Sequence, residues 1–250
     1  MKMGSIRKVL ASCIVLLLLA VPVIAQEDGD DEGIDSGTII DVLNTLTVNQ
    51  TPDYVTRYDD VPQSRTEDGA FVLGNPDAEV VIVEFADFMC PHCQAYEPTI
   101  QQLITEHVLT GDIRLEYRMF PIVNPNLSPL TAQLAECAGE QGNFWGAHDY
   151  IFELSSSQRV DMDVVNNVVD TLALDMEAME SCLATADQFL TDSELGNSLG
   201  VTGTPSILLS VGEVGPNWVV ANGEPLRGAL PYEVLELIIQ AALNGEFQSN

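Results

Sequence analysis

Hydrophobic and polar positions follow two different periods along this chain, and the changes between them predict its elements. Residues 80–85 (Val-Val-Ile-Val-Glu-Phe) are mostly β-branched and apolar, which predicts a short buried strand after the turn residues 75–77. Apolar residues then recur at helical spacing to about Leu109, and Gly111 is a suitable stop for this helix. The sequence therefore predicts a strand that passes almost directly into a helix.

Other segments with a period of two flank this pair. Residues 70–76 predict a first edge strand and its turn, and residues 113–120 alternate between apolar and polar positions as a second strand does. A strand, a helix and a strand in this order imply a right-handed parallel unit. Residues 206–211 and 218–221 predict two more strands, and residues 231–243 predict a closing amphipathic helix.

Between residues 124 and 199 the period lengthens to about 3.6, which indicates helices. The expected helices are one from Ser128, one over 144–154, one capped by Asp161, one capped by Asp175 and one over 186–199. The whole pattern predicts an α/β fold. A helical insertion, residues 124–199, separates two parts of a sheet domain, residues 69–123 and 200–250.

The N-terminal residues have the composition of a targeting segment. Basic residues precede an apolar stretch, and Val23-Ile24-Ala25 offers a small-residue cleavage site, so residues 1–25 predict a secretory signal peptide. An uncleaved membrane anchor is the alternative, because residues 9–25 are at the lower edge of the length that spans a bilayer. Residues 26–68 are acidic, and we expect them to form a disordered extension.

The net charge of the chain argues against some classes of binding partner. The chain carries a formal net charge of −29, and removal of residues 1–25 would leave six arginines against 38 acidic residues, or −32. Such a surface repels the phosphates of nucleic acids and the headgroups of anionic lipids. We therefore expect no nucleic-acid partner, and we interpret the acidity as a source of solubility or an adaptation to a salty medium.

A Cys-x-x-Cys pair stands at the predicted junction of strand and helix. The unpaired N–H groups and the positive end of a helix dipole stabilise a thiolate at Cys90. Pro91 suits the first helical position, and His92 can place a positive charge or a donor beside the sulfur. All three features lower the pKa of Cys90, while Cys93, one turn further on, is placed to close a disulfide.

A zinc site is the alternative interpretation of this pair. Structural zinc sites usually need a second Cys or His pair at short spacing. His107 and His148 are single residues and are expected to be ordinary packing or surface residues. Redox chemistry is therefore favoured over metal binding, and no metal is expected.

Two motifs together carry a resemblance to a known family. The segment Glu84-Phe-Ala-Asp-Phe-Met-Cys90-Pro91-His92-Cys93, followed far downstream by Val201-Thr-Gly203-Thr204-Pro205, resembles the DsbA-like thiol:disulfide oxidoreductases of the thioredoxin superfamily. The resemblance covers about residues 69–246. It implies a thioredoxin-like fold with a helical insertion, and a cis-proline loop in which Thr204, before Pro205, offers backbone groups to a substrate chain.

Glu84 interrupts an otherwise apolar strand. A buried carboxylate tends to stay protonated with a raised pKa. One interpretation is a strand-edge residue that reaches solvent. The resemblance favours the other, in which Glu84 accepts a proton from Cys93 or donates one to it during exchange.

Cys137 and Cys182 fall on the apolar faces of two predicted helices. An even number of cysteines in an exported protein indicates disulfides, and Cys13 would leave with the leader. We rank a structural disulfide first, two buried free thiols second and a second redox pair third.

These observations lead to an exported thiol:disulfide oxidase that acts on reduced or unfolded exported proteins outside the cytoplasm. By resemblance, a quinone-linked membrane oxidase of the DsbB or vitamin K epoxide reductase type would reoxidise it, and no organic cofactor is implied. An isomerase or reductase on the same fold is the first alternative. A peptide-binding, chaperone-like module is the second, although such a module needs neither Cys90 nor Cys93.

Overall fold

The computed structural model describes residues 54–161, 163–211, 218–219 and 226–246. They belong to a unit that begins at Thr51. The predicted signal peptide and most of the acidic extension lie outside the described residues, as does the predicted turn at 212–217. Within the described ranges, no helix combines the length and apolar character that a membrane span requires.

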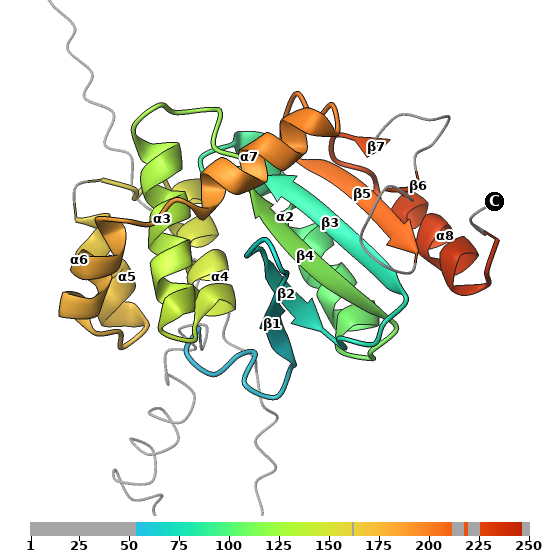
Figure 1. Cartoon of the computed structure of the whole chain (residues 1–250), viewed down its shortest axis with the longest axis horizontal. Coiled ribbons are helices and arrows are strands. Elements are labelled where there is room, and N and C mark those ends of the chain that lie inside the picture. The colour runs from blue at the N-terminus through green and yellow to red at the C-terminus, as the bar shows by residue number, and fades with distance from the viewer. Residues whose placement is uncertain (1–53, 162, 212–217, 220–225, 247–250) are drawn as a thin grey trace, which may run out of the picture. The chain divides into compact units, whose positions relative to one another are not determined.

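A mixed sheet forms the centre of this unit, with strand order β1-β2-β4-β3-β5-β6 and with β7 also paired to β5 (Figure 1). Its strands are β1 Gln63–Arg65, β2 Phe71–Gly74, β3 Val80–Ala86, β4 Ile113–Met119, β5 Ser206–Val211, β6 Trp218–Val219 and β7 Leu226–Arg227. Strand β3 runs parallel to β4 and antiparallel to β5. The predicted strand–helix–strand unit is therefore confirmed.

Helices cover both faces of the sheet (Figure 1). They are α2 Pro91–Leu103, the π-helix η1 Ile104–Val108, α3 Leu127–Glu140, α4 Phe144–Ser156, α5 Val164–Thr171, α6 Met176–Leu183, α7 Gln188–Ser198 and α8 Tyr232–Leu243. Helices α3 to α7 all lie between β4 and β5 in the chain, so the predicted helical insertion is confirmed. In Figure 1, α7 crosses one face of the sheet and α2 lies against the other.

Strand β3 is buried on both faces, which explains its nearly continuous apolar sequence. Because successive side chains of a strand point to opposite faces, the strand contributes to two cores. Val80 and Ile82 join the larger core, which includes α2, α4 and α8. Val81 and Val83 join a smaller core beside α7. Glu84 therefore points toward the α2 side, into the protein.

Two predictions for the N-terminal side are wrong. Strand β2 is not an edge strand, because β1 pairs with its outer side. The described part of the extension, residues 54–68, is also not disordered: Tyr54 and Tyr58 are buried, and they pack against Tyr150 and Trp145. These rings bury enough apolar surface to order a segment whose composition is otherwise polar.

One helix cap is also placed differently from the prediction. The N-cap of α5 is Asp163, not Asp161. The carboxylate of Asp161 accepts a hydrogen bond from the backbone N–H of Asp163 at 2.9 Å, so it closes the turn before the helix. Asp175 caps α6 as predicted, and it accepts from the N–H of Ala178.

Candidate active site

The loop between β3 and α2 is organised by the buried carboxylate of Asp87. One of its oxygens accepts the N–H of Met89 at 2.9 Å. The other accepts the consecutive N–H groups of Ile122 and Val123, each at 2.8 Å. A single side chain thus joins the loop before Cys90 to the loop after β4. Nothing in the sequence pattern distinguishes Asp87 from a turn residue.

Cys90 is the N-cap residue of α2, and Pro91 occupies the first helical position, as predicted. Cys90 and Cys93 are free thiols, and their residues are only 4% and 1% exposed. The Sγ of Cys90 donates a hydrogen bond to the backbone oxygen of Thr204 at 3.4 Å. The peptide bond between Thr204 and Pro205 is cis. The structure therefore brings the two sequence motifs together across a separation of 114 residues.

The two thiols have opposite tendencies to ionise. The pKa of Cys90 is lowered to about 5, first because the Cys93 thiol donates to its sulfur, while burial opposes this effect. The side chain of Thr204 and the backbone N–H groups of Cys93 and His92 lower this pKa further. The pKa of Cys93 is raised far above its ordinary value by its hydrogen bond to Cys90 and by burial. Charge in the dithiol form is therefore concentrated on Cys90.

His92 lies beside Cys90 on the first turn of α2, and its side chain is exposed. Its backbone N–H is among the groups that lower the pKa of Cys90. Within the described part of the chain, the imidazole makes no side-chain hydrogen bond or ion pair with Cys90. Lowering of the Cys90 pKa by the imidazole stays a prediction. The backbone N–H of His92 is a second group of this residue that lowers the same pKa.

Glu84 is 2% exposed and does not reach solvent. Its pKa is raised to about 8, mainly by burial and further by the charge of Glu97, while His148 opposes the shift. Its charge also raises the pKa of Cys93. Its Oε2 atom has no hydrogen-bond partner among the residues that the structure describes. The interpretation of Glu84 as a strand-edge residue that reaches solvent is therefore wrong, and its exchange of a proton with Cys93 stays a prediction.

Behind the cysteines lies a group of polar side chains, of which the sequence pattern singled out only Glu84 as a candidate site residue. We call it the buried polar cluster: Glu84, Glu97, Tyr117, His148 and Asp149. His148 is fully buried, and rings of Phe88, Tyr117, Phe144, Trp145 and Phe152 surround it. The position of Glu97, four residues after Cys93 and so on the same helix face, was the one available signal.

Two groups of residues in the described ranges offer donor atoms of the kind that bind metal ions. One is Glu97, His148 and Asp149, and the other is Glu106, His107 and Glu236. In the first group, Asp149 already accepts hydrogen bonds from Arg57, Tyr58 and Gln101. An adjacent guanidinium disfavours a cation, so we interpret this group as a hydrogen-bond network.

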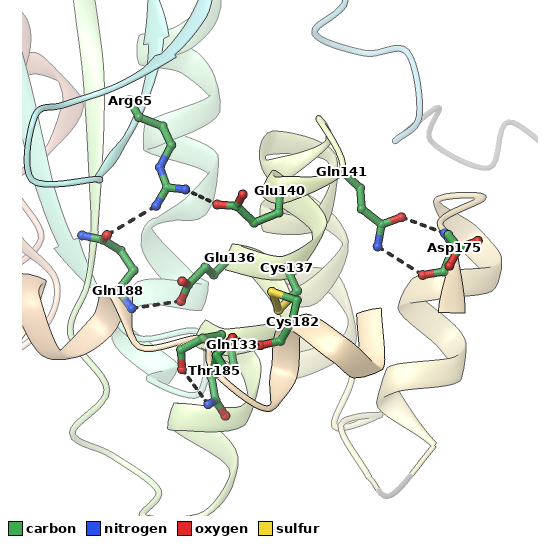
Figure 2. Close-up of a disulfide and its surroundings, with 11 residues drawn as sticks. Arg65, Gln133, Glu136, Cys137, Glu140, Gln141, Asp175, Cys182, Thr185 and Gln188 are labelled. Atoms are coloured by element: carbon green, nitrogen blue, oxygen red, sulfur yellow. Dashed lines mark hydrogen bonds and ion pairs between the residues drawn. A yellow bond between two sulfur atoms is a disulfide. The ribbon is translucent and has the colours of Figure 1, made fainter. Parts of the chain in front are cut away.

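Cys137 and Cys182 form a disulfide that joins α3 to α6, with an S–S distance of 2.03 Å (Figure 2). Figure 2 shows polar side chains of α3 on either side of it. The amide of Gln141 binds both backbone groups of Asp175, and Gln133 donates to the backbone oxygen of Ala186 at 2.8 Å. The disulfide and these bonds tie the insertion together at a distance from Cys90 along the chain.

Comparison with known proteins decides the family. A family model described as "Thioredoxin" matches residues 66–217. The chain belongs to the thioredoxin family. Its solved structural neighbours include alpha-DsbA1 of Wolbachia pipientis, with a TM-score of 0.61 and 20% identity over 70% of this chain and 90% of that chain. BdbD of Bacillus subtilis has a TM-score of 0.57 and 23% identity over 70% and 92% of the two chains. The resemblance to the DsbA-like fold is confirmed.

The proteins of similar sequence differ in how much of their own length the match covers. Disulfide bond formation protein D of Bacillus subtilis is 24% identical over 192 residues, which cover 71% of this thioredoxin-family chain and 79% of that protein. Na(+)/H(+) antiporter NhaA 1 of Salinispora arenicola is 28% identical over 178 residues. The match covers 70% of this chain but 25% of that antiporter, so this chain spans about a quarter of its length.

Proposed function

We propose that this protein is a DsbA-like thiol:disulfide oxidoreductase that acts as an oxidase on exported proteins. The observation that carries the proposal is the pairing of Cys90 with Cys93 at the start of α2. The first sulfur has a pKa of about 5 and the second has a strongly raised pKa. A stabilised thiolate favours the dithiol form of the enzyme, which makes its disulfide form an oxidant.

The reaction transfers two electrons from a substrate dithiol to the enzyme disulfide. A substrate thiolate attacks the Sγ of Cys90, the bond between Cys90 and Cys93 breaks, and Cys93 leaves as a thiolate that takes up a proton. A second substrate thiolate then attacks the substrate sulfur of the mixed disulfide. Cys90 leaves as a thiolate, which is a good leaving group because its pKa is low. The substrate is oxidised and the enzyme is reduced.

Two further residues have roles in this proposal. Glu84 supplies the proton that Cys93 takes up, since a carboxyl group whose pKa is about 8 still holds its proton at neutral pH. Thr204 lies beside the Cys90 sulfur, and its loop would pair with an extended substrate segment as an added strand. Pro205 follows it in the cis peptide, as the resemblance implies.

The cycle requires reoxidation and an oxidising compartment. By family resemblance, a quinone-linked membrane oxidase of the DsbB or vitamin K epoxide reductase type would take the two electrons. The substrates would be reduced or unfolded exported proteins. Export through the leader at residues 1–25 is part of this proposal.

The reduction potential of the purified protein tests the proposal. Equilibration with glutathione redox buffers, followed by alkylation and mass spectrometry, gives the potential of the Cys90–Cys93 couple. A parallel assay follows oxidation of a model peptide with two cysteines, with Cys90→Ser as the inactive control. A potential near that of glutathione or above it, with rapid peptide oxidation, supports an oxidase. A much more negative potential, with faster reduction of a disulfide-bonded test protein, supports a reductase.

An isomerase and a peptide-binding module would each behave differently in the same assays. An isomerase would rearrange a scrambled test protein faster than it oxidises a reduced one. A peptide-binding module would bind unfolded chains equally well after Cys90→Ser and Cys93→Ser, and it would show no turnover.

A further inference from the structure

The proposed reaction creates a problem of proton access. In the proposed reaction, a substrate bonded to Cys90 would cover the side of the active site where Thr204 lies, because Thr204 contacts the Cys90 sulfur. Cys93 is 1% exposed and Glu84 is 2% exposed, so neither exchanges protons directly with water. Yet Cys93 gains a proton when the enzyme is reduced and loses one when it is reoxidised. A second route to solvent, away from the substrate, would allow that exchange.

Polar atoms around Glu84 are buried and unpaired. Glu84 is the register partner of Tyr117 across β3 and β4. The Glu84 Oε2, the Tyr117 hydroxyl and the His148 Nε2 have no hydrogen-bond partner among the described residues. Buried polar groups are paired in the great majority of cases, so each exception calls for an explanation. These three side chains therefore have atoms that are not committed to another hydrogen bond among the described residues.

His148 connects this region to the other side of α2. Its ring lies 4.7 Å from the ring of Tyr117, centroid to centroid, and it is fully buried. Its Nδ1 lies 3.0 Å from an oxygen of Asp149. The imidazole therefore has one nitrogen on a carboxylate and one nitrogen unpaired. An imidazole in this situation can accept a proton at one nitrogen and release one from the other.

Glu97 and Asp149 bring the cluster to a pocket. Gln101 donates to Glu97 at 2.8 Å and to Asp149 at 3.0 Å, so it links the two acids. Both acids line a pocket of about 300 Å³ between α2 and α4, together with Arg57. Neither active-site cysteine nor Thr204 lines this pocket. It therefore opens elsewhere than at the contact of Cys90 with Thr204.

We propose that His148 and Glu97 form a proton relay that joins Glu84 to the pocket between α2 and α4. This inference rests on the proposed redox function. On reduction, Glu84 gives its proton to the Cys93 thiolate, His148 restores the proton to Glu84, and Glu97 passes a proton from water in the pocket to His148. On reoxidation, the proton travels in the opposite direction. One proton is exchanged with solvent in each half-cycle.

The charges around His148 suit this role. The titratable and charged groups near it are Glu84 on β3, Tyr117 on β4, Cys93 and Glu97 on α2, Asp149 on α4, and Arg57 and Tyr58 in the segment before β1. Glu97, Asp149 and Glu84 together raise the pKa of His148 although burial lowers it. Burial raises the pKa of Glu97, so this carboxyl group holds a proton at a higher pH than an exposed one does.

A mixed disulfide of Cys90 with thionitrobenzoate isolates the step in which Cys93 must lose its proton. Release of the coloured thiolate by Cys93 is followed by absorbance across a pH series, in light and heavy water and at rising imidazole concentration. Positioned acid–base groups contribute about 10²–10⁴-fold to rates, and for the more distant His148→Gln we expect a loss of about tenfold at neutral pH. The slower rate should increase with imidazole concentration, and the solvent isotope effect should increase as well.

His107→Gln is the matched control, because His107 is also buried and bound to a carboxylate, that of Glu236, but lies outside the buried polar cluster. It should release the thiolate as the wild type does. Glu97→Gln at the partly exposed pocket should slow release in the same buffer-dependent way, and it decides the question if His148→Gln does not fold.

The outcomes separate the relay from the proposed function. Wild-type rates in both variants, with slow release by Glu84→Gln, would overturn the relay and leave the redox function intact. A loss that neither buffer nor pH alters would show a structural role and would also overturn the relay. Failure of the wild-type mixed disulfide to release its thiolate would instead refute the redox function.

Discussion

The two redox forms of the protein should differ in stability by an amount that depends on pH. The reduced form can ionise Cys90, whereas the oxidised form has no thiol there. A group whose pKa is lower in the folded state stabilises that state above its unfolded pKa, and the stabilisation is lost as the pH falls through the folded pKa. For Cys90 the window therefore extends from about 5, the folded value, up to 9.0, the ordinary value.

The size of the effect follows from this shift. At pH 7 the medium is two units above the folded pKa, and one unit corresponds to about 1.4 kcal/mol, which gives about 2.7 kcal/mol. We reduce this by roughly half for screening of the thiolate, to about 1.4 kcal/mol. The same free energy corresponds to about 30 mV in the potential of a two-electron couple.

Urea unfolding of the reduced and oxidised forms at several pH values measures this difference. The free energy of unfolding of the reduced form, relative to that of the oxidised form, should rise by roughly 0.7 kcal/mol per pH unit between pH 5.5 and 7.5. Groups that titrate equally in the reduced and the oxidised form do not contribute to this difference in the free energy of unfolding. Cys90→Ser, which has neither a thiolate nor a disulfide at this position, is the control. Its free energy of unfolding, measured against that of the oxidised wild type, should show no such rise.

Two results would refute this reasoning. A difference that does not change with pH would mean that no thiolate is stabilised at Cys90. An oxidised form that becomes relatively more stable as the pH rises would reverse the sign, and a reductase would then replace the proposed oxidase.

Three further predictions concern the other cysteines and the helix start. Replacing Cys137 and Cys182 by Ala should lower the free energy of unfolding by about 4 kcal/mol in the chain-entropy model, given their separation of 45 residues, and urea unfolding measures it. Iodoacetamide should label Cys90 before Cys93 in the reduced protein and well below the ordinary pH of thiol labelling, whereas preferential labelling of Cys93 would reverse the assignment. His92→Ala should raise the pKa of Cys90 in the same assay, and the increase should shrink in high salt because the imidazole is exposed.

The elements that could be predicted from the sequence are those with strong local signals. Strand β3 has an unbroken run of buried positions, and α2 begins at a cysteine followed by Pro91. The helices between β4 and β5 follow from periodicity alone. The segment 54–68 is different, because its acidic composition outweighs two tyrosines whose burial depends on α4. Composition averages over a segment, whereas packing is decided by single side chains.

The buried polar cluster shows a second limit of sequence reasoning. Its members come from β3, β4, α2 and α4, and no spacing along the chain relates Glu84 to His148. A histidine on an apolar helix face is usually a packing residue, and His148 does pack against aromatic rings. Its unpaired nitrogen and its acidic neighbours become visible only when the four elements are assembled.

Two buried acids of the sheet differ in their ionic partners. Glu116 on β4 and Glu84 on β3 are both nearly inaccessible, but they point to opposite faces of the sheet. Glu116 lies 2.5 Å from the guanidinium of Arg118, which also contacts Asp192 and Asp68. Glu84 contacts no guanidinium or ammonium group in the described part of the chain. Each of the two acids has one oxygen without a hydrogen-bond partner among the described residues, but Glu116 is also held by a cation. We therefore expect Glu116 to stabilise the fold and Glu84 to exchange a proton.

Matched substitutions test this contrast. Glu116→Gln leaves a buried cation partly unpaired, and breaking a buried pair costs about 3–5 kcal/mol, so this variant should unfold at lower urea without a change in the pH profile of Cys93-dependent thiol release. Glu84→Gln should keep or increase stability, since it removes the cost of a buried carboxyl group, but the profile should lose its titration near pH 8. The distinction fails if Glu84→Gln destabilises as much as Glu116→Gln and leaves the pH profile unchanged, because Glu84 would then be another structural acid.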